Sequence, residues 1–174
     1  LGYYEAATPG MEGGDNTTLR LDLDNEPQPD AFLRIAPKAG GQSSTSQDGY
    51  VEGAPELAAE IASSSASYDL HDKLKVYRRN GVLEYCVWRV GDGAIDWFLL
   101  EGGEYRRQQP DGSGVYRSRV FPGLWLDSGA LLRGDLARVL AGLDEGVRTP
   151  EHAAFVERLG AATAEVPPPR GHRG

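Results

Sequence analysis

The sequence predicts a mixed α/β or α+β domain, and three patterns along the chain indicate it. Residues 57–62 are almost continuously apolar, which is typical of a central strand covered on both faces. Residues 68–80 change to a helical period, with large apolar side chains at i, i+4 and i+7 on one face. Residues 84–119 then alternate strand patterns with glycine-rich turns, which favours an antiparallel meander. The order of strands, one amphipathic helix, strands and final helices places both element types in one domain.

Two strands and a long loop are expected before the central strand. Residues 1–16 are mixed and turn-rich. Residues 18–23 alternate strictly between polar and apolar side chains, as a strand with one buried face does. Residues 30–36 form a second strand after Pro29. Residues 37–54 are a polar, glycine- and serine-rich loop, and loops of that length are usually functional or mobile.

Four strands and two helices are expected after the predicted helix. They span residues 84–90, 94–100, 104–109, 114–119, 128–143 and 150–164. Ser128 is expected to cap the first of these two helices, which Gly134 interrupts. Thr149 caps the second, and Pro150 occupies its first position, where a missing N–H is tolerated.

Length and composition indicate one globular domain. The chain has 174 residues, of which 40% are hydrophobic and 25% charged. We expect a single domain over 1–164 and a disordered tail over 165–174, which is rich in proline and glycine. Because the first residue is Leu, further elements of the domain are expected upstream of it.

Several classes of protein are disfavoured by simple counts. No run approaches the roughly 20 apolar residues that a membrane span needs, so no membrane partner is expected. Cys86 is the one cysteine, which excludes an internal disulfide framework and a cysteine-rich zinc site and fits the reducing cytoplasm. Eighteen basic and 26 acidic residues give a net charge of −8, and this balance argues against binding nucleic acid by charge alone.

Three polar residues are candidates for chemistry. Glu60 is a carboxylate inside an apolar run, and it requires a partner, a metal, water or a place at the exposed end of a strand. Asp30 follows Pro29 at the start of a strand, where an ordinary turn would also place an aspartate. Lys73 flanks the apolar face of the predicted helix. It either points toward the Glu60 strand or pairs with Asp69, four residues earlier.

Two acids on neighbouring strands and a nearby lysine indicate a known kind of site. Two carboxylates can hold Mg²⁺, or Mn²⁺, through oxygen ligands. Such a metal activates water and stabilises charge on a phosphodiester, and a lysine adds a positive charge near the phosphate. No phosphate-binding loop, dinucleotide fingerprint or serine nucleophile motif competes with this interpretation.

At these residues the chain resembles the Uma2 family, also called DUF820. The resemblance covers residues 8–160, and it is carried by Gln28-Pro29-Asp30, by 55–63, and by Asp69-Leu70, Lys73, Tyr77, Gly81-Val82, Glu84-Tyr85 and 118–126. It implies the restriction-endonuclease-like fold of the PD-(D/E)XK superfamily, a mixed sheet flanked by helices. It also implies a Mg²⁺-dependent endonuclease that hydrolyses DNA.

The resemblance implies a role for each matched position. Asp30 matches the first metal-binding acid and Glu60 the acid of the (D/E)XK half-motif. The lysine two residues after that acid is missing, because Ala62 stands there, and Lys73 on the following helix matches the basic position. Glu56 matches an acidic position that is an accessory ligand. The family's N-terminal hairpin and helix, which often carry another acid, are not expected within the chain.

Two other functions stay open at this point. One is a catalytically inactive nuclease fold that acts as a binding or regulatory module, and the net charge of −8 favours it. The exposed strands of the meander would then offer an edge for a homodimer. The other is a nuclease whose substrate is RNA or structured DNA.

Overall fold

A computed structural model of the protein describes residues 1–22, 26–63 and 67–165, with side chains outside 67–71. The elements follow one another as α1 (Gly2–Ala7), β1 (Met11–Asp15), β2 (Leu19–Arg20), β3 (Ala31–Ile35), the 3₁₀ turn η1 (Pro37–Ala39), β4 (Ser44–Thr45), β5 (Val51–Glu52), β6 (Leu57–Ala62), α2 (Ser67–Arg79), β7 (Glu84–Arg89), β8 (Ala94–Glu101), β9 (Glu104–Gln108), β10 (Val115–Arg117), β11 (Trp125–Asp127), α3 (Ser128–Leu132), α4 (Leu136–Val147) and α5 (Pro150–Glu165).

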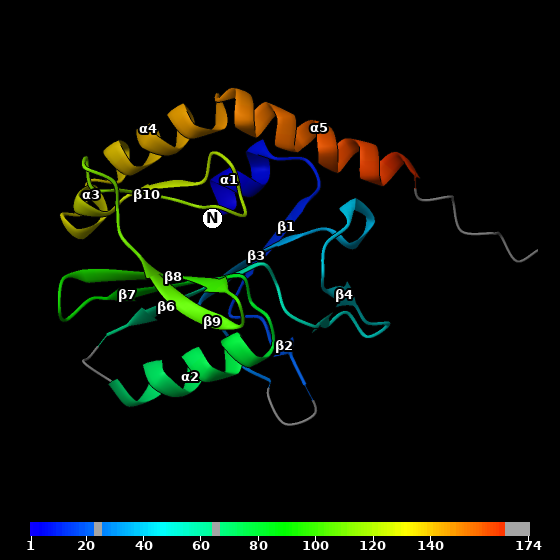
Figure 1. Ribbon diagram of the computed structural model, residues 1–174, viewed down its shortest axis with the longest axis horizontal. Helices are drawn as coiled ribbons and strands as arrows, with labels where there is room; N and C mark the ends of the chain where they lie inside the picture. The colour runs from blue at the N-terminus through cyan, green and yellow to red at the C-terminus, as the bar shows by residue number, and fades with distance from the viewer. Residues whose placement is uncertain (23–25, 64–66, 166–174) are drawn as a thin grey trace, which may run out of the picture.

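A six-stranded mixed sheet is the centre of the molecule, with the strand order β1-β3-β6-β7-β8-β9. The β6–β7 pair is parallel, and the other pairs are antiparallel. Helix α2 covers one face of the sheet, whereas α1, α4 and α5 lie over the other (Figure 1). The parallel pair requires a crossover, and α2 supplies it. The predicted mixed sheet flanked by helices is therefore confirmed.

The N-terminal segment is more regular than its composition indicated. Residues 1–16, read as turn-rich, contain α1 and β1, and β1 pairs antiparallel with β3. The strand expected over 18–23 shrinks to β2, which pairs parallel with β5 in a small separate sheet. The loop expected over 37–54 supplies η1, β4 and β5. These short elements are stabilised by tertiary contacts, which local sequence periodicity does not report.

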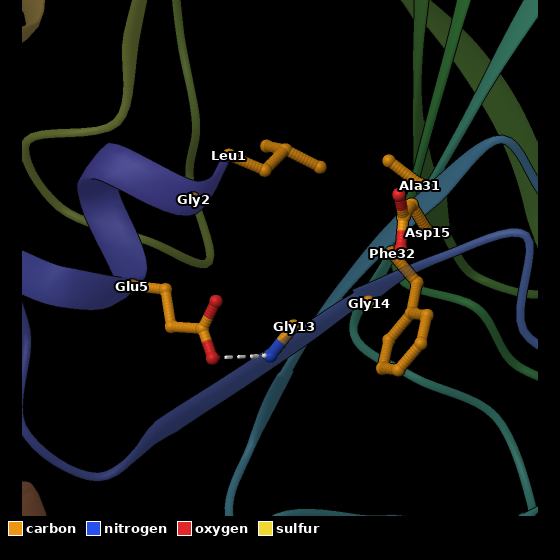
Figure 2. Close-up of a pocket in the computed structure, with 8 residues that line it drawn as sticks. All are labelled: Leu1, Gly2, Glu5, Gly13, Gly14, Asp15, Ala31 and Phe32. Carbon is orange, nitrogen blue, oxygen red and sulfur yellow. Dashed lines mark hydrogen bonds between the residues drawn. The ribbon is translucent and has the colours of Figure 1, made fainter.

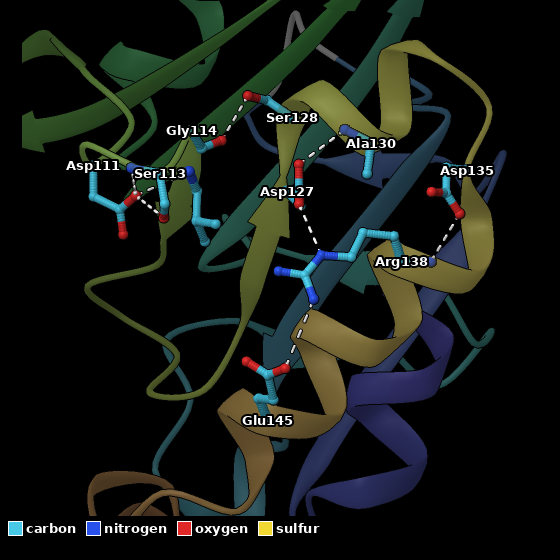
Figure 3. Close-up of polar contacts among 10 residues, drawn as sticks. Asp111, Ser113, Gly114, Asp127, Ser128, Ala130, Asp135, Arg138 and Glu145 are labelled. Carbon is cyan, nitrogen blue, oxygen red and sulfur yellow. Dashed lines mark hydrogen bonds and ion pairs between the residues drawn. The ribbon is translucent and has the colours of Figure 1, made fainter.

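The meander is confirmed over β7, β8 and β9 but ends there. β10 leaves the main sheet and pairs with β11 instead. The turn before β10 explains this: the Asp111 carboxylate accepts hydrogen bonds from the N–H groups of Ser113 and Val115 and redirects the chain (Figure 3). A side chain that bonds its own turn in this way competes with continued pairing.

The helix expected from Ser128 does begin at Ser128, but its N-cap is the residue before it. Asp127 is the N-cap of α3, and its Oδ1 accepts a hydrogen bond from the N–H of Ala130 at 2.8 Å. The Ser128 hydroxyl donates to the carbonyl of Gly114 instead, so it fastens the helix to the preceding turn (Figure 3). Gly134 separates α3 from α4 as predicted, with a φ of +74° that favours glycine. Within the described residues, no helix is long and apolar enough to cross a membrane.

The sheet carries a separate apolar cluster on each face. The cluster between the sheet and helices α4 and α5 is the larger one, with buried Leu57, Trp97, Leu143 and Phe155. The cluster under α2 is smaller and is built around two tyrosines; its buried residues are Ala54, Ala58, Tyr77, Val82, Tyr85 and Val87. The face under α2 therefore brings phenolic hydroxyls into the interior beside a strand that carries a carboxylate.

Glu84 is a fully buried carboxylate with no cationic neighbour among its hydrogen-bond partners. Its oxygens accept from the N–H groups of Arg119 and Val120 and from the indole of Trp97. It fastens the segment after β10 to the main sheet. Burial raises the pKa of the Glu84 carboxyl, and the hydrogen bonds oppose that rise.

This raised pKa predicts a pH-dependent difference between the wild type and Glu84→Gln. The fold favours the protonated carboxyl, so the contribution of Glu84 is complete below its usual value of 4.5 and is lost as the pH rises through the folded-state pKa. Urea unfolding of both proteins at several pH values above about 4.5 should therefore show the wild type losing stability relative to Glu84→Gln. Parallel stability curves, or the opposite slope, would contradict this.

Candidate active site

Asp30 and Glu60 meet at the junction of β3 and β6. The two strands pair antiparallel with Ala31 opposite Ala59 and Phe32 opposite Ala58. One further step of this register places Asp30 opposite Glu60, on the sheet face under α2. Asp30 itself lies just before β3, and its Oδ2 accepts a hydrogen bond from the N–H of Ile61 at 2.6 Å. The N–H of Ile61 is thus accepted by the Asp30 side chain, where a regular strand pair would use a backbone carbonyl.

Glu60 is held by two side chains of α2. Only 7% of the residue is exposed. The Lys73 ammonium donates to its Oε2 at 2.8 Å, and the Tyr77 hydroxyl donates to its Oε1 at 2.9 Å. Both oxygens of this buried carboxylate therefore have a partner from the chain. This is what a buried charge requires.

The helical spacing explains why these two residues reach one carboxylate. Lys73 and Tyr77 are four residues apart, so they lie one above the other on the same face of α2. Tyr77 is fully buried, whereas Lys73 is half-buried at the edge of that face. Sequence reasoning placed Tyr77 in the core and missed its polar role. The available signal was its phenol four residues after a lysine, on the face directed at Glu60.

The charges at this site oppose one another. Burial raises the pKa of the Glu60 carboxyl, Lys73 and Tyr77 lower it, and the charge of Asp30 raises it again. The pKa of Tyr77 is raised far above its usual value, first by burial and then by Glu60, so its hydroxyl stays protonated and donates. Lys73 is the cation that contacts Glu60 directly.

Tyr85 adds an unsatisfied hydroxyl to the same apolar cluster. Its ring centroid lies 5.0 Å from that of Tyr77. The hydroxyl is buried and has no hydrogen-bond partner among the described residues. Burial raises the pKa of Tyr85, and the charges of Glu60 and Asp30 add to the rise. Such a buried, unpaired hydroxyl is uncommon in folded proteins.

Basic side chains near the site are paired with acids. Lys75 contacts Asp72 and Arg78 contacts Glu104, while Arg79 donates to Asp22 at 2.7 Å. The positive charges on α2 are therefore largely compensated by acids within the fold. A nucleic acid that bound to α2 would have to displace these acids from the basic side chains.

Two further basic side chains lie on or just after β3. Arg34 is buried and bonds to Glu12, Thr45 and the carbonyl of Ser44, so it joins β1, β3 and β4. Lys38 is exposed on η1. Arg34 is thus part of the scaffold and offers no free charge to a ligand.

Glu56 does not serve the site as the accessory ligand that we expected. It is buried, and its two oxygens accept from the N–H groups of Ile35 at 2.8 Å and Gln42 at 2.9 Å. It holds the end of β3 against the loop that follows. The alternative pairing of Lys73 with Asp69 lies outside the described side chains, and the ammonium of Lys73 bonds to Glu60.

Two cavities adjoin the junction. An open one of about 410 Å³ lies between α1, β1 and β3 (Figure 2). There the Glu5 carboxylate accepts from the N–H of Gly13 at 2.9 Å. A Cβ at Gly13 would lie 2.9 Å from that carboxylate, and one at Gly14 would lie 2.6 Å from the ring of Phe32. The glycines therefore permit the close approach of α1 and β1.

The second cavity shares Leu1 and Ala31 with the first. It measures about 300 Å³, is mostly apolar, and is bordered by Asp30 and Glu60. All three tryptophans of the chain, Trp88, Trp97 and Trp125, line it. The two acids thus stand at the rim of an aromatic hollow as well as beneath α2.

The residues present fit a divalent cation held through oxygen. Asp30 and Glu60 are the two carboxylates that the register, continued by one residue, brings together, and the charge of Asp30 acts on Glu60. Among the described residues, no cluster of three or more His, Cys, Asp or Glu side chains forms a complete cage. That donor set suits Mg²⁺, which usually keeps several waters and takes one or two protein carboxylates with substrate phosphates.

Comparisons with known proteins bear on the family and on the fold. The family model Uma2, described as "Putative restriction endonuclease", matches residues 4–129. A solved structure from Anabaena variabilis ATCC 29413, titled a "putative nuclease belonging to DUF820", aligns with a TM-score of 0.54 at 13% identity. The alignment covers 71% of this chain and 69% of that one, and at this identity it shows the fold. A search of curated proteins finds no significant match.

Proposed function

The chain belongs to the Uma2 family, and from this premise we propose that it is a Mg²⁺- or Mn²⁺-dependent endonuclease that hydrolyses DNA phosphodiester bonds. Asp30 and Glu60 would hold the metal, and Lys73 is the catalytic cation. The observation that carries the proposal is the junction of β3 and β6, where the two acids share a register position and the lysine bonds directly to Glu60.

Each side chain has a distinct task in this proposal. When bound, the metal supplies Lewis acidity at the phosphate and lowers the pKa of a water. Asp30 contributes a rigid anionic ligand, because its carboxylate is fixed to the N–H of Ile61. Glu60 contributes the second ligand. Lys73 places a positive charge where the phosphate gains negative charge in the transition state.

The experiment that tests this function is a cleavage assay on plasmid and single-stranded DNA with Mg²⁺, with Mn²⁺ and with a chelator. Asp30→Asn should lose at least about 10²-fold in rate, because an amide is a much poorer metal ligand than a carboxylate. Asp72→Asn is the matched control, since Asp72 is exposed on α2 and pairs with Lys75. It should cleave as the wild type does.

Cleavage that survives the chelator, or that Asp30→Asn retains in full, would refute the metal site. An RNA substrate in the same assay separates a deoxyribonuclease from a nuclease that accepts either nucleic acid. If RNA is cut and DNA is not, the substrate part of the proposal is wrong while the metal site stands.

One observation favours a second function, a catalytically inactive binding or regulatory module. The basic side chains of α2 are already paired with acids, and the chain carries a net charge of −8. Such a surface does not attract a polyanion strongly. A wild-type protein that binds neither metal nor DNA but forms a stable homodimer would support this alternative over the nuclease.

A further inference from the structure

Lys73 occupies one of the two ligand oxygens of Glu60. Its ammonium lies 2.8 Å from Oε2, while Tyr77 holds Oε1 at 2.9 Å. The Glu60 side chain is only 8% exposed, so it has little freedom to turn away from either partner. A divalent cation that binds Glu60 must therefore approach an oxygen that already accepts a hydrogen bond from one of these side chains.

The two partners differ in how easily they can leave. Tyr77 is fully buried, and its ring packs against Tyr85 with centroids 5.0 Å apart. The Lys73 side chain is 39% exposed and sits on a flexible four-carbon stem, so its ammonium can move into water at little cost. An incoming cation also repels the ammonium but not the phenol.

We propose that the Lys73 ammonium is the counterion of Glu60 in the metal-free protein and that it leaves Oε2 when a divalent metal binds there. Tyr77 remains on Oε1 as a positioning residue. This inference rests on the proposed metal site. Exchange moves the lysine from the carboxylate toward solvent at the same edge, where a phosphate would arrive. Metal binding and the release of the catalytic cation are then one event.

The exchange has a counterintuitive consequence for metal affinity. A lysine that lay away from Glu60 would leave the metal affinity nearly unchanged when removed. A lysine that competes for Oε2 lowers that affinity, so its removal should strengthen binding while cleavage is lost. The two effects of one substitution then have opposite signs.

The experiment is a calorimetric titration of the full chain with Mg²⁺ and with Ca²⁺ in buffer at mildly alkaline pH. We expect Lys73→Met to bind either cation about tenfold more tightly than the wild type, because a close like charge is removed. Lys75→Met is the matched control on the same helix, where the lysine is exposed and pairs with Asp72. Its affinity should equal that of the wild type.

The Tyr77 part of the proposal has its own pair of variants. Tyr77→Phe should weaken metal binding, because Glu60 loses the donor that fixes its orientation. Tyr105→Phe is the control from the same aromatic cluster, since the Tyr105 hydroxyl donates to the carbonyl of Val82. It should bind metal as the wild type does. Equal affinities for Tyr77→Phe and the wild type would overturn the positioning role.

The outcomes separate this inference from the function on which it rests. If wild type binds metal and Glu60→Gln does not, but Lys73→Met binds no more tightly than wild type, the exchange is wrong and the metal site stands. If wild type binds no metal, or Glu60→Gln binds equally well, the metal site itself is wrong and the exchange falls with it. Lys73→Gln repeats the test with a polar side chain in case Lys73→Met does not fold.

Discussion

Glu60→Gln is expected to lose about 10³-fold in metal-dependent cleavage, the largest effect of any single substitution in the proposed site. Glutamine keeps the shape of the side chain and leaves an oxygen for the Tyr77 hydroxyl. It removes the negative charge that a cation requires, and it turns an amide N–H group toward the Lys73 ammonium. Single-turnover cleavage of a labelled duplex at saturating Mg²⁺ measures the effect.

The control for this variant is Glu104→Gln. Glu104 is exposed on β9 and pairs with Arg78 of the same helix that carries Lys73. The substitution removes one acid near α2 and leaves the junction of β3 and β6 unchanged. Its rate should stay close to that of the wild type. A Glu60→Gln protein that is folded and fully active would place the chemistry elsewhere in the chain.

Glu56→Ala is expected to lower the free energy of unfolding by about 4 kcal/mol, the largest effect on stability. The substitution leaves two N–H groups, of Ile35 and Gln42, without the carboxylate that accepts from them. It also leaves a cavity at a position that is 3% exposed. Urea unfolding of variant and wild type gives the difference directly.

Glu52→Ala is the comparison for Glu56→Ala. Glu52 is exposed on β5 and takes part in a long ion pair with Arg20, so its loss should change stability by less than about 0.5 kcal/mol. The metal affinity of folded Glu56→Ala, measured under conditions where it remains native, should match that of the wild type. A lower affinity would restore Glu56 as a metal ligand.

The central elements could be predicted because their patterns are long and their partners lie nearby in sequence. The apolar run gave β6 at its observed bounds, and the helical period gave α2 to within one residue at each end. The short elements could not be predicted in the same way. β2, β4 and β5 have two residues each and exist because they pair with one another, and no window of sequence contains that information.

The candidate site was predictable in its members but not in its contacts. Asp30, Glu60 and Lys73 were singled out as residue types in a pattern, and the fold brings them to one edge of the sheet. The role of Tyr77 required the angle between α2 and β6. The prediction for Glu56 was wrong for a related reason. The sequence does not distinguish a buried acid that binds a metal from one that accepts hydrogen bonds from two backbone N–H groups.

The residues of the candidate site come from two kinds of element, strands and a helix. This difference affects which of them can change position. The acids stand on strands whose register is fixed by backbone pairing, so their spacing tolerates little drift. The lysine stands on α2, whereas Ala62 occupies the strand position two residues beyond Glu60, on the same face. Both positions face Glu60, so a lysine on either element would reach its carboxylate while the two acids stay in place.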